Sequence, residues 1–253
     1  MAINLETREG GVLVISLNDP DRRNPLGHPV RQELVRVLSQ AESDDEIKAV
    51  VLTGAGGHFS VGGDIRDQST RSIEQQRERF ATVKDMIGRI VRFSKPFVCA
   101  VEGWAAGGGF ALAMACPTIV ASREANFVAG FTKIGLIPDM GMLATLPARV
   151  GPARARRIMM TNRKITAADA HTIGMVDALS EEGQAVAMAC DLAREEAAGA
   201  PLPRQFIADW FARDVDAALD YEHLLQPILL NSDDAAEGRA AFFEKRAALF
   251  KGR

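Results

Sequence analysis

The chain has 253 residues, which is enough for one large domain or for one domain with an extension. Hydrophobic residues make up 47% of the sequence and charged residues 25%, the balance of a globular protein rather than a disordered or fibrous one. The formal net charge of −3 argues against a broad nucleic-acid-binding surface, which needs a basic face, but leaves room for a local basic patch that holds a phosphorylated ligand.

The three cysteines, Cys99, Cys116 and Cys190, lie far apart and form no CxxC pair and no Cys/His cluster with zinc spacing. We interpret them as small buried side chains in a reducing compartment, without disulfides or a metal site. The N-terminus lacks the basic and apolar regions of a secretory signal, and no apolar run approaches the length of a membrane span. These features predict a cytoplasmic protein that binds neither membranes nor nucleic acid.

The first part of the chain predicts alternating strands and helices. Apolar residues on both sides of a Glu-Gly-Gly turn predict a β-hairpin over Ile3–Arg8 and Val12–Leu17. Helical periodicity predicts helices over about 29–41 and 72–92. Between them, residues 47–53 form an apolar run that is typical of a buried strand.

The pattern continues with a strand over Phe97–Val101 and a short apolar helix that ends near Met114. Three further short strands are expected at residues 118–121, 126–128 and 176–179. Beyond these, the pattern is mostly helical, with helix starts expected near residues 140, 151, 166 and 181. Alternating strands and helices followed by a helical tail indicate an α/β core with a C-terminal helical extension.

Two glycine-rich turns stand where an apolar strand is expected to run into a helix. They are residues 57–65, with the sequence GHFSVGGDI, and residues 103–111, with the sequence GWAAGGGFA. Glycine lets the backbone approach a ligand closely, and the first N–H groups of a helix have no partners within it. Two such turns side by side can aim two N–H groups at one oxygen atom, which is the arrangement of an oxyanion hole.

Five segments, in this order, resemble the crotonase (enoyl-CoA hydratase/isomerase) family. Asn24-Pro25-Leu26 is similar to an early N-A-L signature, with proline in place of alanine. Residues 59–65 resemble the family's F-[SC]-A-G-[AG]-D-[ILV] turn, and residues 101–109 resemble its V-x-G-x-A-x-G-G-G turn. Residues 133–141 are similar to x-x-G-[LI]-x-P-x-x-G, and residues 237–246 to the C-terminal helix.

The resemblance implies an α/β fold, a spiral of ββα units of the ClpP/crotonase type with a C-terminal helical region that forms trimers. It divides the chain into an acyl-CoA-binding core over residues 1–195 and a helical region over residues 196–253 that covers the active site. It further implies a homotrimer or a dimer of trimers, with an acyl-CoA thioester as substrate. No cofactor is implied beyond the coenzyme A of the substrate.

By their positions in the motifs, Gly63 and Gly108 would donate the two N–H groups that bind the thioester oxygen. The two glutamates of the family's hydratases fall on Ala111 and Phe131, and neither side chain can activate water. The resemblance leaves Asp139 as the catalytic base, since members without those glutamates use an aspartate at this place. The open alternative is that Asp139 only caps a helix starting near residue 140.

The resemblance also implies which residues bind the substrate. Arg22, Arg66 and Lys245 suit the phosphates of CoA, with a solvated surface charge as the alternative for each. Asp64 follows the oxyanion glycine and is expected to form a salt bridge or a cap rather than to react. The full predicted set is Arg22, Asp64, Ile65, Arg66, Trp104, Ala111, Phe131 and Lys245.

Three functions remain open at this point. One carboxylate is sufficient to shift a double bond through a thioester enolate, so we expect isomerisation of an enoyl-CoA. The second function is hydration by another carboxylate, or a lyase or hydrolase reaction on the same oxyanion hole. The third is a relative that binds acyl-CoA without turnover.

Overall fold

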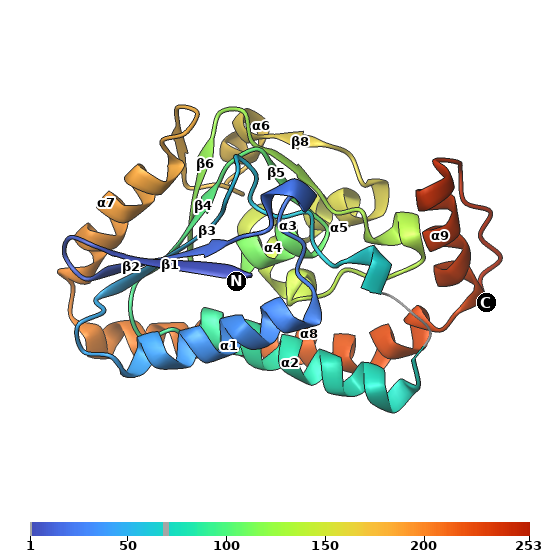
Figure 1. Ribbon diagram of the computed structural model, residues 1–253, viewed down its shortest axis with the longest axis horizontal. Coiled ribbons are helices and arrows are strands. Elements are labelled where there is room, and N and C mark those ends of the chain that lie inside the picture. Colours follow the sequence, from blue (N-terminus) through green and yellow to red (C-terminus); the bar gives the residue numbers. More distant parts are fainter. Residues whose placement is uncertain (1, 68–70) are drawn as a thin grey trace.

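The computed structural model describes residues 2–67 and 71–253 of the chain (Figure 1). Within these residues, the main sheet has six strands in the order β1-β2-β3-β4-β6-β9. They are β1 (Ile3–Arg8), β2 (Val12–Leu17), β3 (Ala49–Gly54), β4 (Phe97–Val101), β6 (Thr118–Ser122) and β9 (Ala178–Ser180). Strands β1 and β2 pair antiparallel, which confirms the predicted hairpin, and the other neighbours pair parallel.

The side chains of the sheet alternate between two apolar clusters, one on each face. One cluster packs against the alanine-rich side of helix α7 (Ala185–Ala197) and includes Val12, Val14, Val51, Val98, Ala100 and Val120. The opposite cluster includes Leu13, Ile15, Val50, Leu52, Cys99 and Ile119. Parallel strands buried on both faces have continuous apolar sequences, which is why apolar runs alone predicted β3 and β4.

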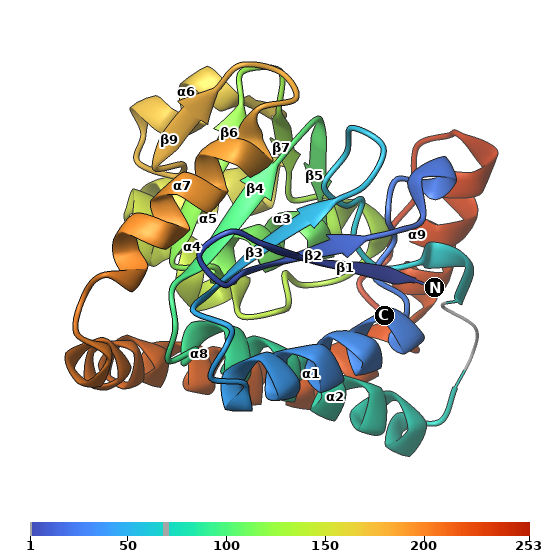
Figure 2. The ribbon, with the colours of Figure 1, turned by 60° about the vertical axis from the view of Figure 1, so that its left-hand side comes forward.

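Three helices lie side by side across the opposite face of the sheet from α7 (Figures 1 and 2). They are α1 (His28–Ser43), α2 (Ile73–Val91) and α8 (Pro201–Leu230). Helices α1 and α2 are amphipathic as predicted, and α2 begins at a capping box formed by Ser72 and Gln75. Helix α8 packs along α2 and adds Val215 and Leu219 to the same core.

A second, three-stranded sheet holds the glycine turns in place. It has the order β5-β7-β8, with β5 (Trp104–Ala106), β7 (Asn126–Val128) and β8 (Ile165–Thr166). Of these strands the sequence predicted only β7, because β5 lies inside a glycine-rich turn and β8 is two residues long. An isolated bridge pairs Ser60 of the first turn with Ala105 of β5, so the sheet extends into the first glycine turn.

The remaining helices are α3 (Gly108–Ala115), α4 (Met142–Val150), α5 (Pro152–Thr161), α6 (Ala167–Thr172) and α9 (Asp233–Glu244), with short 3-10 turns at Pro20–Arg22, Ile65–Asp67 and Phe131–Ile134. Two predicted helices exist but begin two and four residues later than expected. The helix expected near residue 140 begins at Met142, because Met140 and Gly141 both have positive φ, at 58° and 77°. The helix expected near residue 181 begins at Ala185, after Gly183 with a φ of 74°.

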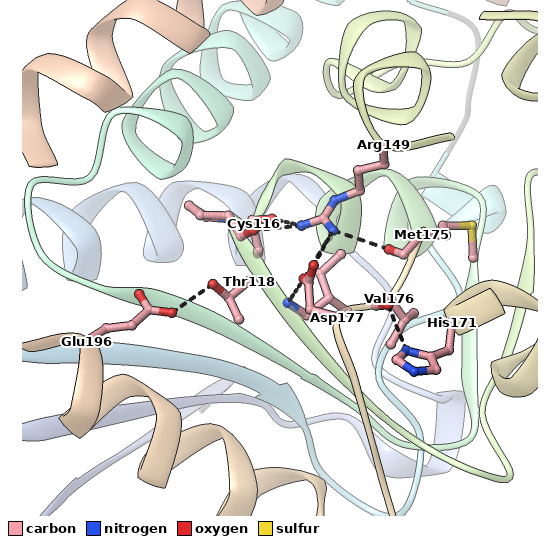
Figure 3. Close-up of polar contacts among 10 residues, drawn as sticks. Cys116, Thr118, Arg149, His171, Met175, Val176, Asp177 and Glu196 are labelled. Atoms are coloured by element: carbon pink, nitrogen blue, oxygen red, sulfur yellow. Dashed lines mark hydrogen bonds and ion pairs between the residues drawn. The ribbon is translucent and has the colours of Figure 1, made fainter. Parts of the chain in front are cut away.

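Arg149 at the end of α4 ties three segments together behind the sheet (Figure 3). Its guanidinium donates to the carbonyls of Cys116 and Pro117 at 3.0 and 2.7 Å and forms an ion pair with Asp177 at 3.1 Å. Asp177 in turn accepts a hydrogen bond from the N–H of Ile119 at 2.7 Å. The arginine therefore satisfies the end of α3 and fixes the chain that leads into β9.

Helices α8 and α9 expose many large apolar side chains. On α8 these include Leu202, Phe206, Ile207, Trp210, Phe211, Tyr221, Leu224 and Ile228, and on α9 Phe242 and Phe243. In the described part of the chain, no helix is long and apolar enough to cross a membrane. The predicted boundary after residue 195 falls in the last turn of α7, and the division into two regions stays a prediction.

Candidate active site

The two glycine turns lie against each other along their backbones. The N–H of Phe59 donates to the carbonyl of Glu102 at 2.9 Å, and the N–H of Ser60 donates to the carbonyl of Trp104 at 3.0 Å. The N–H of Ala106 returns a bond to the carbonyl of Ser60 at 2.9 Å. These bonds fix the relative position of two segments that lie more than forty residues apart in the chain.

The N–H groups of Gly63 and Gly108 lie next to each other at the end of these turns. A Cβ atom on Gly108 would lie 3.5 Å from the nitrogen of Gly63, and one on Gly62 would lie 2.5 Å from the nitrogen of Gly108. Neither N–H donates a hydrogen bond to an acceptor among the described residues. Gly108 is also the first residue of α3, where the helix dipole favours negative charge. Two neighbouring N–H groups without an acceptor are what an oxyanion hole requires.

Two glycines in these turns are required by close contact. A Cβ atom on Gly109 would lie 2.3 Å from the carbonyl oxygen of Ser60, and Gly62 has a φ of 84°. A side chain on Gly109 would overlap the backbone of Ser60. A side chain on Gly62 would overlap the backbone of Gly108 and would also require an unfavourable positive φ.

Asn24 supports the first turn from beneath, and it is only 1% exposed. Its Nδ2 donates to the carbonyls of Ala55 and His58 at 2.9 and 2.8 Å. The hydroxyl of Ser60 donates to the carbonyl of Asn24 at 2.7 Å and accepts from the N–H of Gly62 at 3.1 Å. The early Asn-Pro-Leu signature is thus part of the scaffold that supports the first glycine turn.

Asp139 lies in a segment that reaches the same place. The Sδ of the next residue, Met140, lies 2.9 Å from the position that a Cβ on Gly108 would occupy. Asp139 is half-buried, and burial raises the pKa of its carboxyl above the ordinary value. The charge of Arg31 and a hydrogen bond from Gln226 act in the opposite direction and favour the ionised form.

The helix-capping alternative for Asp139 is wrong. The N-cap of α4 is Gly141, and no side chain caps this helix. The contribution of Asp139 is its backbone carbonyl, which accepts a hydrogen bond from the N–H of Met142 at 3.2 Å. The carboxylate instead accepts a hydrogen bond at Oδ2 from Nε2 of Gln226 at 3.1 Å.

Two further polar residues, which the sequence did not predict, belong to this candidate site: Glu222 and Gln226 of α8. Both are buried, at 1% and 0% exposure, and they stand one helical turn apart on the side facing the Asp139 segment. Burial and the nearby charge of Asp139 raise the pKa of Glu222 to about 8. The available signal was a pair of polar residues at i and i+4 between apolar ones, but such a pair is equally typical of a solvated helix face.

The positions of the two absent glutamates are closed to water. Ala111 in α3 is fully buried, and Phe131 in a 3-10 turn is 6% exposed. Neighbouring aromatic side chains add to this apolar surface, since the rings of Phe110 and Phe127 pack with centroids 5.5 Å apart.

The predicted substrate-binding residues fall into separate groups. Arg22 and Asp64 form an ion pair at 2.9 Å and line a pocket of about 370 Å³ together with the start of α1. The N–H of Trp104 donates to Nδ1 of His58 at 3.3 Å. Ile65 and Arg66 follow Asp64 in a 3-10 turn. Lys245 is exposed at the end of α9, at the opposite end of the molecule from α7 (Figures 1 and 2).

Residues 7–253 match the family described as enoyl-CoA hydratase/isomerase. The chain belongs to this family. It is 34% identical over 257 residues to 1,2-epoxyphenylacetyl-CoA isomerase of Escherichia coli (strain K12), covering 97% of each chain. It is 30% identical over 255 residues to 2,3-dehydroadipyl-CoA hydratase of the same strain, covering 98% of each.

Solved structures of this family confirm the predicted fold. An enoyl-CoA hydratase from Mycobacterium avium subsp. paratuberculosis K-10 superposes with a TM-score of 0.89 at 30% identity, covering 99% of each chain. An enoyl-CoA hydratase/isomerase from Pseudoalteromonas atlantica T6c gives 0.88 at 30% identity, covering 99% of this chain and all of the other. The chain is thus an enzyme of the enoyl-CoA hydratase/isomerase family with the crotonase fold.

Proposed function

We propose that this enzyme shifts the double bond of an enoyl-CoA thioester, using Asp139 as its single acid–base group. The main support is that the residue after Asp139 packs against Gly108, whose N–H has no acceptor among the described residues, while Ala111 and Phe131 replace the two glutamates. Hydration needs one group to activate water and a second to deliver a proton, whereas isomerisation needs only one group to move a proton between two carbons.

The proposed reaction has two steps. The Asp139 carboxylate removes a proton from one carbon of the acyl chain, and the electron pair of that C–H bond moves into the thioester to give an enolate. The N–H groups of Gly63 and Gly108 donate to the enolate oxygen. Asp139 then returns the proton to a different carbon, the double bond reforms in its new place, and the enzyme recovers its starting charge. Removing one such N–H donor costs about 2.7–4 kcal/mol of barrier in enzymes with an oxyanion hole.

The surroundings of Asp139 suit a proton shuttle. Burial makes the carboxylate a stronger base, while the charge of Arg31 keeps it ionised enough to accept a proton. Phe131 and Ala111 exclude water that would otherwise add to the double bond. The relative from Escherichia coli is named an isomerase of a CoA ester, and its named substrate is an epoxide rather than an enoyl-CoA. The named hydratases among the relatives make hydration the second candidate.

We further propose that the substrate is bound as an acyl-CoA at the pocket beside Arg22, with Lys245 meeting CoA phosphates. The exposed aromatic side chains of α8 and α9 suit a contact between copies of the chain, and we propose a homotrimer or a dimer of trimers. Phe206, Trp210 and Phe211 are each more than 60% exposed, which is unusual for the surface of a monomer.

Proton exchange in deuterated water tests the reaction whatever acyl group the natural substrate carries. A panel of saturated and unsaturated acyl-CoA esters is incubated with enzyme, and deuterium at the α and γ carbons is measured by mass spectrometry. We expect exchange together with a moved double bond, and loss of both in Asp139→Asn. Asp85→Asn, an exposed aspartate of α2 paired with Arg89, is the matched control and should exchange normally.

Hydration gives a different result in the same experiment. The product would gain the mass of one water, and oxygen from labelled solvent would appear in it. Exchange that persists in Asp139→Asn, or a hydrated product as the main outcome, would contradict the proposed isomerisation.

A further inference from the structure

Two buried polar side chains of α8 hold the segment that contains Asp139. Nε2 of Gln226 donates to Oδ2 of Asp139 at 3.1 Å and to the carbonyl of Ile137 at 2.9 Å. Oε2 of Glu222 accepts a hydrogen bond from the N–H of Gly141 at 2.9 Å. Because both partners of Nε2 are acceptors, the amide of Gln226 has one orientation, with its NH₂ group toward the segment.

We propose that Gln226 and Glu222 are positioning residues for the reaction, a pair that fixes the carboxylate of Asp139 by binding the segment before and after it. This inference rests on the proposed role of Asp139 as the catalytic base. A carboxylate has two oxygens and about four acceptor sites, so one hydrogen bond to Oδ2 leaves capacity for a substrate proton.

The spacing of the pair matches the segment that it holds. Residues at i and i+4 lie on one face of a helix, one above the other. Gln226 binds the segment at Ile137 and Asp139, and Glu222 binds it at Gly141. Two contact points separated along the helix fix both the place and the direction of the short segment between them.

The segment needs such support because its backbone is unusual. Met140 has a φ of 58° and is followed by Gly141 with a φ of 77°. A residue other than glycine in this region costs free energy and persists only where surrounding contacts hold it. The hydrogen bond from Gly141 to Glu222 is one such contact, and the packing of Met140 against Gly108 is another.

The burial of the pair also indicates a specific role. Oε1 of Glu222 and Oε1 of Gln226 have no hydrogen-bond partner among the described residues. A buried polar atom without a partner is destabilising, and an apolar residue at either place would avoid that cost. The side chains are thus poor choices for stability alone and good ones for holding a neighbouring carboxylate.

Burial raises the pKa of Asp139, and three charged or polar side chains interact with this residue. Arg31 of α1 is positive, Gln226 of α8 is a neutral donor, and Glu222 of α8 is a carboxyl group. The hydrogen bond from Gln226 lowers the pKa of Asp139. Its removal should therefore raise that pKa and reduce the ionised fraction of Asp139 at a given pH. The net stabilisation from a hydrogen bond to a charged group corresponds to a change of about one unit or more in the pKa of that group.

The test compares Gln226→Met, which keeps the side-chain length without the donor, with the wild-type enzyme. Gln205→Met is the matched control, because it makes the same change on an exposed position of the same helix. We expect Gln226→Met to lower kcat roughly tenfold to a hundredfold. We expect KM to stay within about twofold, because the amide does not bind the substrate. Glu222→Gln, which keeps an acceptor for Gly141, should retain more activity than Glu222→Met.

A measurement that does not depend on turnover completes the test. The pKa of Asp139 is read by NMR on protein with ¹³C-labelled aspartate carboxyls, with Asp139→Asn identifying the signal. We expect that pKa to rise by about one unit in Gln226→Met and not to change in Gln205→Met. Gln226→Glu, which fills the same space, should also raise it and serves if the methionine variant does not fold.

The outcomes separate the two proposals. A Gln226→Met enzyme with wild-type kcat and an unchanged Asp139 pKa would overturn the positioning role, even where Asp139→Asn is inactive. A raised Asp139 pKa in Gln226→Met, combined with full activity in Asp139→Asn, would support the positioning contact and reject Asp139 as the base.

Discussion

Glu222 accepts a hydrogen bond from the backbone N–H of Gly141 at 2.9 Å, although the two residues lie 81 positions apart. The carboxyl is 1% exposed and its pKa in the folded protein is about 8, against an ordinary value of 4.5. Glu222 therefore binds its carboxyl proton more tightly in the folded state than in the unfolded state. The contribution of protonated Glu222 to the free energy of unfolding is fully present below about pH 4.5 and is lost as the pH rises to about 8.

Glu222→Gln should remove this pH dependence. Each pKa unit corresponds to about 1.4 kcal/mol, so the variant should gain up to about 3 kcal/mol in the free energy of unfolding at pH 7. Near pH 4.5 the gain should be small. Urea unfolding of both proteins between pH 5 and 8 measures the difference, and equal stability at all pH values would show that the buried carboxyl does not change its pKa on folding.

Gly108→Ala should lower activity strongly with a small effect on stability. The added methyl group would lie 2.9 Å from Sδ of Met140 and 3.5 Å from the nitrogen of Gly63, where the thioester oxygen is expected. Displacing one oxyanion donor costs about a hundredfold to a thousandfold in kcat. The flexible methionine can move aside, so the fold should survive.

Gly88→Ala is the control for Gly108→Ala. Gly88 stands in α2, and its nearest neighbour for a new Cβ is 3.8 Å away. That variant should gain roughly 0.5–1 kcal/mol in stability and keep its kcat. Similar kinetics for the two alanine variants would argue against the oxyanion hole.

Asn24→Ala should destabilise the protein by about 3 kcal/mol, because it leaves two partly buried carbonyls without donors. The lost partners are the carbonyls of Ala55 and His58, and alanine is also a poor residue for the positive φ of 57° at this position. Thermal or urea unfolding measures the loss. Asn4→Ala, at an exposed position of β1, should stay within about 0.5 kcal/mol of the wild type.

The pH dependence of kcat/KM should show an acidic limb set by Asp139. A base must be ionised, so activity falls as the pH drops through the pKa of this carboxyl. Burial raises that pKa above 3.8, and the limb should therefore lie at a higher pH than for an exposed aspartate. Steady-state rates across the acidic range measure it, and activity that persists undiminished down to pH 3.8 would contradict the assignment.

Charged residues on the exposed face of α8 should prevent assembly. Phe211→Asp places a carboxylate on a position that is 73% exposed in the single chain. The substitution should not destabilise the single chain, because the position is exposed. A contact between copies of the chain, however, would lose apolar burial and gain an unpaired charge. Light scattering of the wild type and the variant measures the change. A wild-type protein that is already monomeric would contradict the proposed trimer.

Local sequence patterns were sufficient where the structure depends on neighbours in the chain. The hairpin, strands β3 and β4, and helices α1 and α2 follow from apolar runs and periodicity, and the glycine turns follow from their composition. The resemblance of the motifs then pointed to Gly63, Gly108 and Asp139, and the structure brings their segments together. The family match and the solved structures confirm the fold and the family of the chain. The roles of these three residues stay predictions.

Distant contacts account for what was missed. The burial of Gln226 and Glu222 depends on where α8 packs, which no local pattern records. Strand β5 is three residues inside a glycine turn and exists because β7 lies beside it. The helix-cap alternative for Asp139 stayed open because the sequence does not show that Met140 adopts a positive φ and delays the helix by two residues.

The paired N–H groups of Gly63 and Gly108 belong to the main chain. Their positions depend on the fold of the backbone and not on the identity of a side chain. A point mutation can crowd these donors but cannot replace them with another functional group. By contrast, the side chains at positions 111, 131 and 139 take no part in the backbone hydrogen bonds between the turns. An ancestor of this enzyme could thus have changed its chemistry by single substitutions around a constant centre, which makes such a scaffold easy to diversify in evolution and in the laboratory.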